Sequence, residues 1–200
     1  RNPKWKINEL FTKCRQDTKN STEDSNKIHE SFETLNQIRE LKNIMKTLAF
    51  TKHRPTIFFD TKNENLSQML PLHDYGTMGL FILTHNKLYI ARDASDKARN
   101  GTIAHEMAHC ALKILYKNKC LPYEETDLER KNEWKKVVKK IKDMYEADPN
   151  NTEPIIANVF QFYKNEDKDE EEYLQEVELA VRVPHMLAHY QGNMEKIKRL

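Results

Sequence analysis

The stretch Gly101–Leu112, with the sequence GTIAHEMAHCAL, places two histidines four residues apart in a segment rich in apolar residues. On a helix, side chains at this spacing lie on one face, with their Cβ atoms about 5–6 Å apart. The imidazoles of His105 and His109 can therefore bind one Zn²⁺ at about 2.0–2.1 Å. Imidazoles that are buried in an apolar helix face need partners, and a metal ion supplies a partner for both. The stretch thus predicts a metal-binding helix.

Glu106 follows the first histidine directly and is not expected to be a ligand, because its place on the helix directs it toward the open metal position. A bound metal lowers the pKa of its water to about 7. A carboxylate at this place can take a proton from that water and later return it to a leaving group. The helix is expected over about Lys97–Lys117, with Asp93 or Ser95 as its N-cap and with Gly101 allowing another backbone to pack closely.

The surrounding sequence predicts a small sheet and several further helices. Apolar positions between Ile28 and Leu48 recur with the helical period and predict an amphipathic helix. Three β-rich runs predict strands, the last two as a hairpin, and they are Thr56–Phe59, Gly79–Leu83 and Leu88–Ala91. Later helical or apolar patterns lie at Asp127–Tyr145, Ile155–Tyr163, Asp169–Val183 and Pro184–Tyr190. The last two are expected to be separate, since the residue before a proline avoids the helical region. Residues 60–78 are expected to form a long loop. The order predicts a helix-dominated α+β fold whose small sheet packs on the helix around His105.

The segment Gly101–Leu112 resembles the active-site helix of the zincin metallopeptidases. The resemblance implies a zinc cofactor, water in the fourth coordination position and Glu106 as general base and acid. It also implies that the strand before the helix runs along the cleft and pairs with an extended peptide. Leu88–Ala91 is the strand expected there, with an internal strand of the sheet as the alternative.

The third ligand distinguishes the branches of this family. The metzincin form continues with a nearby third histidine, whereas here Cys110–Leu115 follows the second one and excludes that form. The gluzincin form takes a glutamate from a later helix, and Glu178 lies on the apolar stripe of the predicted helix Asp169–Val183. Glu176 is the alternative on the same helix, and His185 and His189 are the alternatives beyond it.

The sequence departs from the gluzincin pattern four residues after Glu178. The pattern has an aspartate there that orients the first histidine ligand, but this chain has Arg182. Groups that orient the ligands must therefore come from elsewhere. His185 and His189 are also considered as the far wall of the cleft, where they would donate a hydrogen bond to the oxyanion.

The charge balance and hydropathy exclude some classes of partner. Lys and Arg total 33 against 31 Asp and Glu, a net charge of +2, which gives no support for a nucleic-acid partner. No stretch approaches the roughly 20 apolar residues that span a bilayer. The start, Arg1–Lys6, lacks a methionine and the apolar core of a signal peptide, so we expect a trimmed chain whose targeting signal is missing.

The number and spacing of the cysteines indicate in which cellular compartment the protein is expected. Cys110 and Cys120 are expected on one helix, too far apart for a disulfide, and Cys14 has no close partner in sequence. Free thiols favour an intracellular, cytoplasmic protein. Four glycosylation-type triplets oppose this expectation, and they begin at Asn20, Asn65, Asn100 and Asn150.

Together these observations predict a zinc-dependent endopeptidase that acts on a peptide or protein substrate, with no indication of its oligomeric state. His105, His109 and Glu178 would hold the metal, and Glu106 would be catalytic. The expected arrangement is an N-terminal helical segment over residues 1–54 and a zincin-like catalytic domain over residues 55–200, or one continuous domain over 1–200. The alternatives in function are a catalytically silent binding or scaffold domain that retains zinc, and a zinc-dependent hydrolase of a non-peptide amide.

Overall fold

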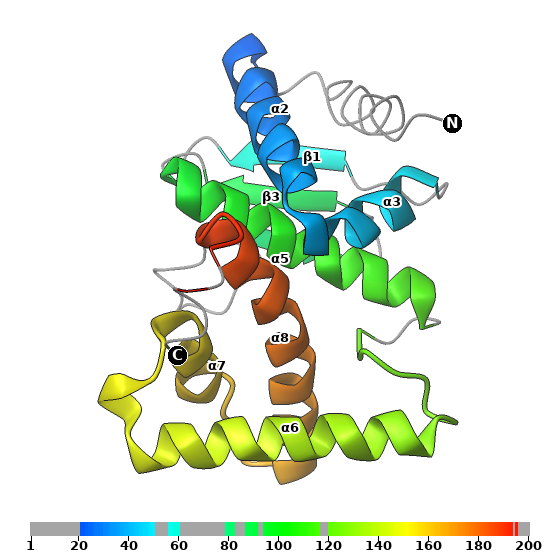
Figure 1. Cartoon of the computed structure of the whole chain (residues 1–200), viewed down its shortest axis with the longest axis vertical. Coiled ribbons are helices and arrows are strands. Elements are labelled where there is room, and N and C mark those ends of the chain that lie inside the picture. Colours follow the sequence, from blue (N-terminus) through cyan, green and yellow to red (C-terminus); the bar gives the residue numbers. More distant parts are fainter. Residues whose placement is uncertain are drawn as a thin grey trace.

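The computed structural model of the chain describes residues 21–50, 56–60, 79–82, 87–91, 94–116, 120–193 and 195, with the side chains of some strand residues and of residues 49–50 left aside. Helices dominate these residues (Figure 1). The elements are α2 (Thr22–Gln37), the 3₁₀ turn η1 (Arg39–Leu41), α3 (Lys42–Phe50), β1 (Thr56–Asp60), β2 (Gly79–Ile82), β3 (Lys87–Ala91), α5 (Asp96–Leu115), α6 (Leu128–Ala147), the 3₁₀ turn η2 (Pro149–Asn151), α7 (Pro154–Phe162) and α8 (Lys168–His189). The predicted loop over residues 60–78 lies almost entirely outside the described residues, as does Cys14.

The segment that was predicted as one helix between Ile28 and Leu48 is two helices, and the single-helix prediction is wrong. The first helix, α2, ends at Ile38, whose backbone is extended with φ −82° and ψ 113°. Buried residues follow one another at steps of three in this region, namely Phe32, Leu35, Ile38 and Leu41. A step of three matches the 3₁₀ helix, which has 3.0 residues per turn. The turn η1 therefore keeps the apolar side chains inside while the chain changes direction.

The three strands form one sheet in the order β1-β3-β2, with β1 parallel and β2 antiparallel to β3. The predicted hairpin of β2 and β3 is confirmed. Because β3 pairs on both sides, its backbone groups cannot take up an extended peptide, so the expectation that Leu88–Ala91 binds substrate by strand addition is wrong. The internal-strand alternative is the one that the structure shows.

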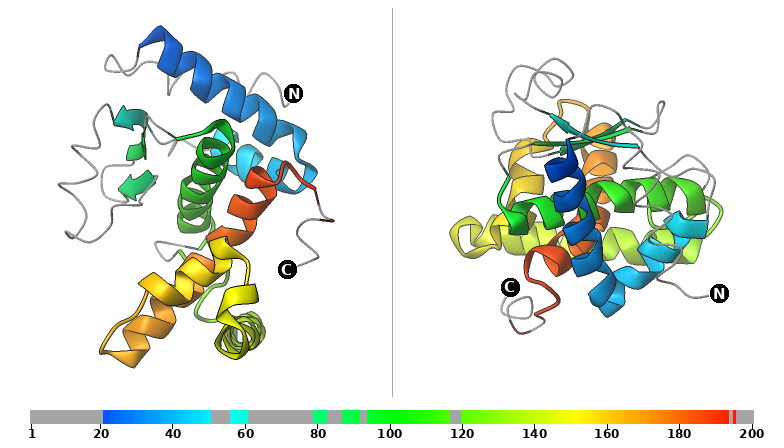
Figure 2. Two further views of the ribbon diagram at one scale, coloured as in Figure 1. Left: turned by 90° about the vertical axis from the view of Figure 1, so that its left-hand side faces the viewer. Right: turned by 90° about the horizontal axis from the view of Figure 1, so that it is seen from above.

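The sheet lies along one side of α5, and α2 crosses α5 from the side of the sheet toward α3 (Figure 2). One hydrophobic core joins them, and it includes Phe32, Leu35, Ile57, Ile90, Ile103, Met107 and Leu187. Residues on both sides of position 54 share this core.

The predicted break before Pro184 is wrong, because α8 continues through this proline to His189. A proline inside a helix removes a hydrogen bond and costs about 3 kcal/mol. The turn beyond it is buried at Met186, Leu187 and Ala188, and burying one large apolar side chain is worth about 1.5–3 kcal/mol. Burial of this turn offsets the proline and keeps α8 continuous where it packs on α5.

The lower half of the molecule in Figure 1 consists of α6, α7 and the first turns of α8. A second apolar cluster joins these helices through Val138, Val159, Phe160 and Leu179. The two halves meet where α8 crosses α5. Among the residues that the structure describes, no helix is both long and apolar enough to cross a bilayer.

Candidate metal centre

Helix α5 carries both histidines of the motif on one face. Its N-cap is Ser95, whose hydroxyl accepts a hydrogen bond from the Ala98 backbone N–H at 3.3 Å, so the second of the two predicted caps is confirmed. The rings of His105 and His109 meet edge to face with their centroids 4.9 Å apart. The predicted placement of both imidazoles on one face of the helix is therefore confirmed.

Gly101 lets α8 come close to this helix. A Cβ atom added at Gly101 would lie 2.8 Å from both Cδ2 and Nε2 of His185 on α8. Carbon atoms in favourable contact are about 3.5–4.0 Å apart, so any other residue here would displace the His185 ring, while the His185 backbone oxygen lies at 3.5 Å. The predicted close approach of a second backbone at Gly101 is confirmed.

The crossing brings Glu178 of α8 to the two imidazoles. The Nε2 of His105 lies 3.4 Å from Oε2 of Glu178, and the Nε2 of His109 lies 3.4 Å from its Oε1. One ligand atom from each residue can be chosen so that all lie within 4.8 Å of one another. The structure thus brings together the three residues that the sequence analysis selected as metal ligands.

The donor set and its spacing fit a zinc ion. Tetrahedral coordination at about 2.0–2.1 Å places ligand atoms about 3.3–3.4 Å apart, and each imidazole Nε2 lies at this distance from one oxygen of Glu178, His105 from Oε2 and His109 from Oε1. In addition, Oε2 of Glu178 is buried without a hydrogen-bond partner. Buried polar atoms normally have one, and a cation between the three residues would supply it.

The charges of the group are coupled. Burial alone would raise the pKa of Glu178, but the imidazoles of His105 and His109 that face its two oxygens hold it well below its usual range. Burial alone would lower the pKa of His109, but hydrogen bonds with the Cys120 thiol and with Glu178, and the charges of Glu178 and Glu106, raise it to about 10. His109 and Glu178 thus stabilise each other's charged forms, and ligation of a metal by His109 would require its imidazole to be neutral.

Glu106 lies beside this group and on the sheet side of α5. Its side chain is 9% exposed, and its Oε1 is 3.8 Å from Nε2 of His105. The first residue of β2, Gly79, packs against it, since a Cβ added there would lie 3.5 Å from Cγ of Glu106 and 2.3 Å from Cγ2 of Thr102. The carboxylate therefore faces the same imidazole nitrogen as Glu178 does, between α5 and β2.

The structure does not bring the alternative ligands into the group. Glu176 accepts a hydrogen bond of 2.6 Å from the Tyr123 hydroxyl and pairs with Lys135 at 3.4 Å. His185 lies on the other side of His105, with 3.4 Å between the two Nδ1 atoms. His189 packs edge to face against Tyr190.

Two other side chains of α8 lie next to this group: Arg182 faces Glu178, and His185 faces His105. Nη2 of Arg182 lies 3.7 Å from Oε2 of Glu178 and donates to Oδ1 of Asn158 at 3.2 Å. Burial, with the neighbouring His105 and Arg182, lowers the pKa of His185 to about 2. His185 is therefore a neutral ring at physiological pH.

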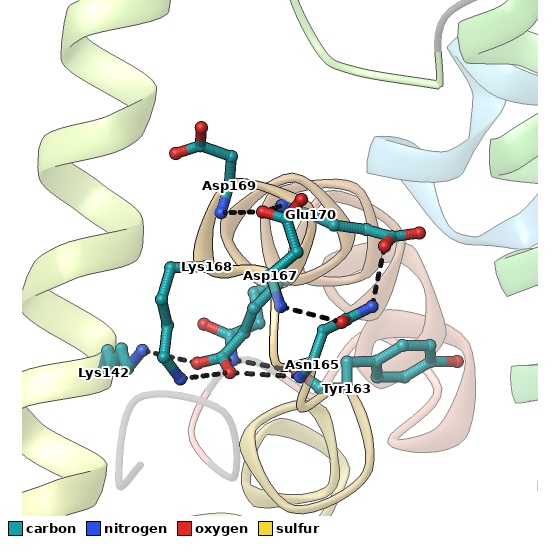
Figure 3. A network of polar contacts seen from close by, with 9 residues as sticks. Lys142, Tyr163, Asn165, Asp167, Lys168, Asp169 and Glu170 are labelled. Atoms are coloured by element: carbon teal, nitrogen blue, oxygen red, sulfur yellow. Dashed lines mark hydrogen bonds and ion pairs between the residues drawn. The ribbon is translucent and has the colours of Figure 1, made fainter.

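Tyr163 is a residue of this region that the sequence analysis missed. Burial and the charges of Glu178 and Glu106 raise the pKa of its hydroxyl above the usual value. Its ring points away from the polar network that holds the start of α8 (Figure 3). Its backbone carbonyl is fixed by Nε2 of Gln175 at 3.0 Å. No motif marks this residue, because it becomes part of the site only through the packing of α7 on α8.

The same network anchors α8 at its first turn. The Glu171 carboxylate accepts hydrogen bonds from Lys142 at 3.2 Å, Lys168 at 3.0 Å and the Asn165 backbone at 3.2 Å (Figure 3). These bonds, with Lys168 the largest cause, lower the pKa of Glu171 to about 2. The network ties α6 and the segment after α7 to the helix that carries Glu178.

Cys110 and Cys120 near the site are buried and are not joined in a disulfide. Cys110 packs in the main core, and burial raises its pKa to about 12, as expected for a packing residue. The expectation that Cys120 shares a helix with it is wrong, since α5 ends at Leu115 and Cys120 folds back with its Sγ 3.8 Å from the carbonyl of His109. The glycosylation-type triplet at Asn100 begins on a residue that is only 5% exposed within α5.

Comparison with known proteins adds no family to this geometry: no protein-family model, no curated protein and no solved structure matches the chain. The function therefore has to be argued from the site itself.

Proposed function

We propose that the protein is a zinc-dependent endopeptidase. The observation that carries this proposal is the group of His105, His109 and Glu178 with the buried carboxylate of Glu106 beside it. Two histidines and a glutamate with an open fourth position are the ligand set of catalytic rather than structural zinc sites. The resemblance of Gly101–Leu112 to the zincin helix points to the same chemistry.

Zinc, when bound, would polarise the carbonyl of the scissile bond and lower the pKa of a water molecule to about 7. The Glu106 carboxylate would accept the proton that the attacking water loses. It would then give this proton to the amine as the C–N bond breaks and the new C–O bond remains. The products are two peptides, and no covalent enzyme intermediate forms.

Tyr163 is the proposed hydrogen-bond donor for the oxyanion. Its raised pKa keeps the phenol protonated, so it can donate to a negative oxygen. A fixed donor of this kind typically accounts for about 10²–10³-fold in rate. Its hydroxyl is close enough to Glu178 and Glu106 for their charges to affect its pKa. The reacting carbonyl would have to lie in this same region, beside the two carboxylates.

The strand β2 is the proposed docking edge for an extended peptide. Within the described residues β2 pairs with β3 alone, so its other backbone edge has no strand beside it there. An extended peptide can add to such an edge through main-chain hydrogen bonds. Gly79, at the start of β2, lies against Glu106, so a peptide on this edge would pass the catalytic carboxylate.

The test is cleavage of a complex peptide library by zinc-loaded wild type and by Glu106→Gln, with cleaved bonds identified by mass spectrometry. We expect cleavage by the wild type and loss of cleavage in Glu106→Gln at unchanged zinc content. A zinc-loaded wild type that cleaves no peptide would contradict the proposal and favour a scaffold domain. Cleavage that persists in Glu106→Gln would contradict the role of this residue.

A further inference from the structure

The His105 ring has a second nitrogen that faces away from Glu178. Its Nε2 faces Glu178 and Glu106, at 3.4 and 3.8 Å, whereas its Nδ1 faces the Nδ1 of His185 at 3.4 Å. The His105 and His185 rings are nearly perpendicular, at 85°, with their centroids 5.5 Å apart. An N–H in the plane of one ring can thus meet the lone pair of the other.

A histidine that binds a metal through one nitrogen usually donates its other N–H to an acceptor, which fixes the tautomer and the orientation of the ring. At position 182, four residues after Glu178, stands an arginine, which has no acceptor atom and instead faces Glu178. Among the hydrogen-bond partners of the described residues, His185 is the one found at Nδ1 of His105.

The direction of this hydrogen bond follows from the metal site. If His105 binds zinc through Nε2, the nitrogen that faces Glu178, then its proton is on Nδ1. One partner in a bond between two nitrogens must accept, so His185 accepts through the lone pair of Nδ1 and carries its own proton on Nε2. Both rings are then neutral, as ligation of a metal by His105 requires.

We propose that His185 is a positioning residue, which holds the His105 ring in the tautomer and orientation that bind the metal, in the role that a carboxylate has in related sites. This inference rests on the proposed metal site. It differs from the two roles considered from the sequence, those of third ligand and oxyanion donor. Both of those roles would require His185 on the Nε2 side of His105. His185 lies on the Nδ1 side instead, so the His105 ring stands between His185 and Glu178.

The fold holds the His185 ring in this place by packing. Gly101 leaves just enough room for it, since a Cβ there would lie 2.8 Å from two of its ring atoms. The residues that follow it, Met186, Leu187 and Ala188, are buried. Orienting groups of this kind are useful only when their own rotamers are fixed by packing, and this condition is met.

The test compares three single variants with the wild type by competition for zinc with a chromophoric chelator. His185→Leu removes the acceptor, His185→Asn keeps an acceptor oxygen near the place of Nδ1, and His189→Leu is the matched control four residues further on α8. Loss of an orienting partner typically weakens zinc affinity by about 10–100-fold. We expect this loss in His185→Leu, a smaller loss in His185→Asn and no change in His189→Leu.

A second readout follows the proton itself. In zinc-loaded wild type labelled with ¹⁵N-histidine, the imidazole spectrum should show a proton on Nδ1 of His105 that exchanges slowly with water. The slow exchange should be lost in His185→Leu. If that variant fails to fold, Gly101→Ala serves instead, because it leaves His185 present but displaces its ring and should weaken zinc binding in the same way.

The outcomes separate this inference from the proposed function. A folded His185→Leu or Gly101→Ala protein with wild-type zinc affinity and an unchanged His105 proton would overturn the role of His185 alone. A wild type that binds no zinc would overturn both. Weaker zinc binding in His185→Leu, together with a wild type that cleaves no peptide, would support the role of His185 and reject the peptidase.

Discussion

The contact of β2 with α5 gives a prediction whose size can be worked from the structure. In Gly79→Ala the new Cβ would lie 2.3 Å from Cγ2 of Thr102 and 3.1 Å from the carbonyl oxygen of Tyr89. Carbon atoms prefer at least about 3.5 Å, so the first contact is too short by about 1.2 Å (3.5 − 2.3). The Thr102 methyl lies on α5, the helix of His105 and His109, and the Tyr89 oxygen belongs to the central strand β3. The strand β2 therefore has to shift.

Overpacking of this kind costs about 1–3 kcal/mol. Replacing glycine by alanine also lowers the conformational entropy of the unfolded chain, which stabilises the folded state by about 0.4–1 kcal/mol. The difference between the two ranges is about 0–2.6 kcal/mol, and because the 2.3 Å contact is far shorter than van der Waals distance we expect a net loss of about 1–2 kcal/mol in the free energy of unfolding. For a chain of this size that corresponds to a fall in Tm of roughly 2–8 °C. The measurement is thermal and urea unfolding of the metal-free protein.

The matched control removes the methyl group that the new Cβ meets. Thr102→Ser shortens the side chain by this methyl, and the double variant Gly79→Ala/Thr102→Ser should recover part of the loss. Residues in direct contact show coupling energies of about 0.5–3 kcal/mol. An unchanged Tm in Gly79→Ala, or fully additive effects in the double variant, would refute the account of this contact. Because β2 carries no ligand, zinc content should stay constant while cleavage of peptides falls.

Two further predictions concern α8 and its surroundings. Glu171 has a pKa of about 2 in the folded chain against a usual value of 4.5, so its stabilising effect is present above pH 4.5 and is lost as the pH falls from 4.5 toward 2. Urea unfolding at several pH values should show this loss in the wild type and a flatter profile in Glu171→Gln, and equal profiles would contradict it. Tyr163→Phe removes the proposed oxyanion donor and should lower kcat by about 10²-fold at unchanged zinc affinity and stability. A wild-type kcat in Tyr163→Phe would exclude the hydroxyl from the chemistry.

Local sequence patterns were sufficient to predict the helices that carry the proposed metal ligands. The spacing of His105 and His109 and the cap at Ser95 depend only on neighbours in one helix, and both are as predicted. Glu178 could be selected because it lies next to the apolar positions of its own helix, and the buried face of α8 indeed points at α5. The hairpin of β2 and β3 was likewise recognisable from two β-rich runs around a short turn.

What could not be predicted depends on contacts between distant segments. The parallel pairing of β1 with β3 makes β3 an internal strand, and nothing within Leu88–Ala91 reveals it. The continuation of α8 through Pro184 depends on the burial of the turn that follows, which outweighs a local preference. The packing of α8 across α5 also places His185 at Nδ1 of His105 rather than at Nε2, the nitrogen that faces Glu178.

The central claim is that His105, His109 and Glu178 hold one zinc ion. The measurement that tests it most directly is the zinc content and zinc affinity of the wild type beside Glu178→Ala, with Glu176→Ala as the matched control on the same helix. We expect one zinc per chain in the wild type and in Glu176→Ala. In Glu178→Ala the affinity should fall by more than about 100-fold, since even the loss of an orienting residue behind a ligand costs about 10–100-fold. A folded Glu178→Ala protein that retains full zinc affinity would contradict the claim.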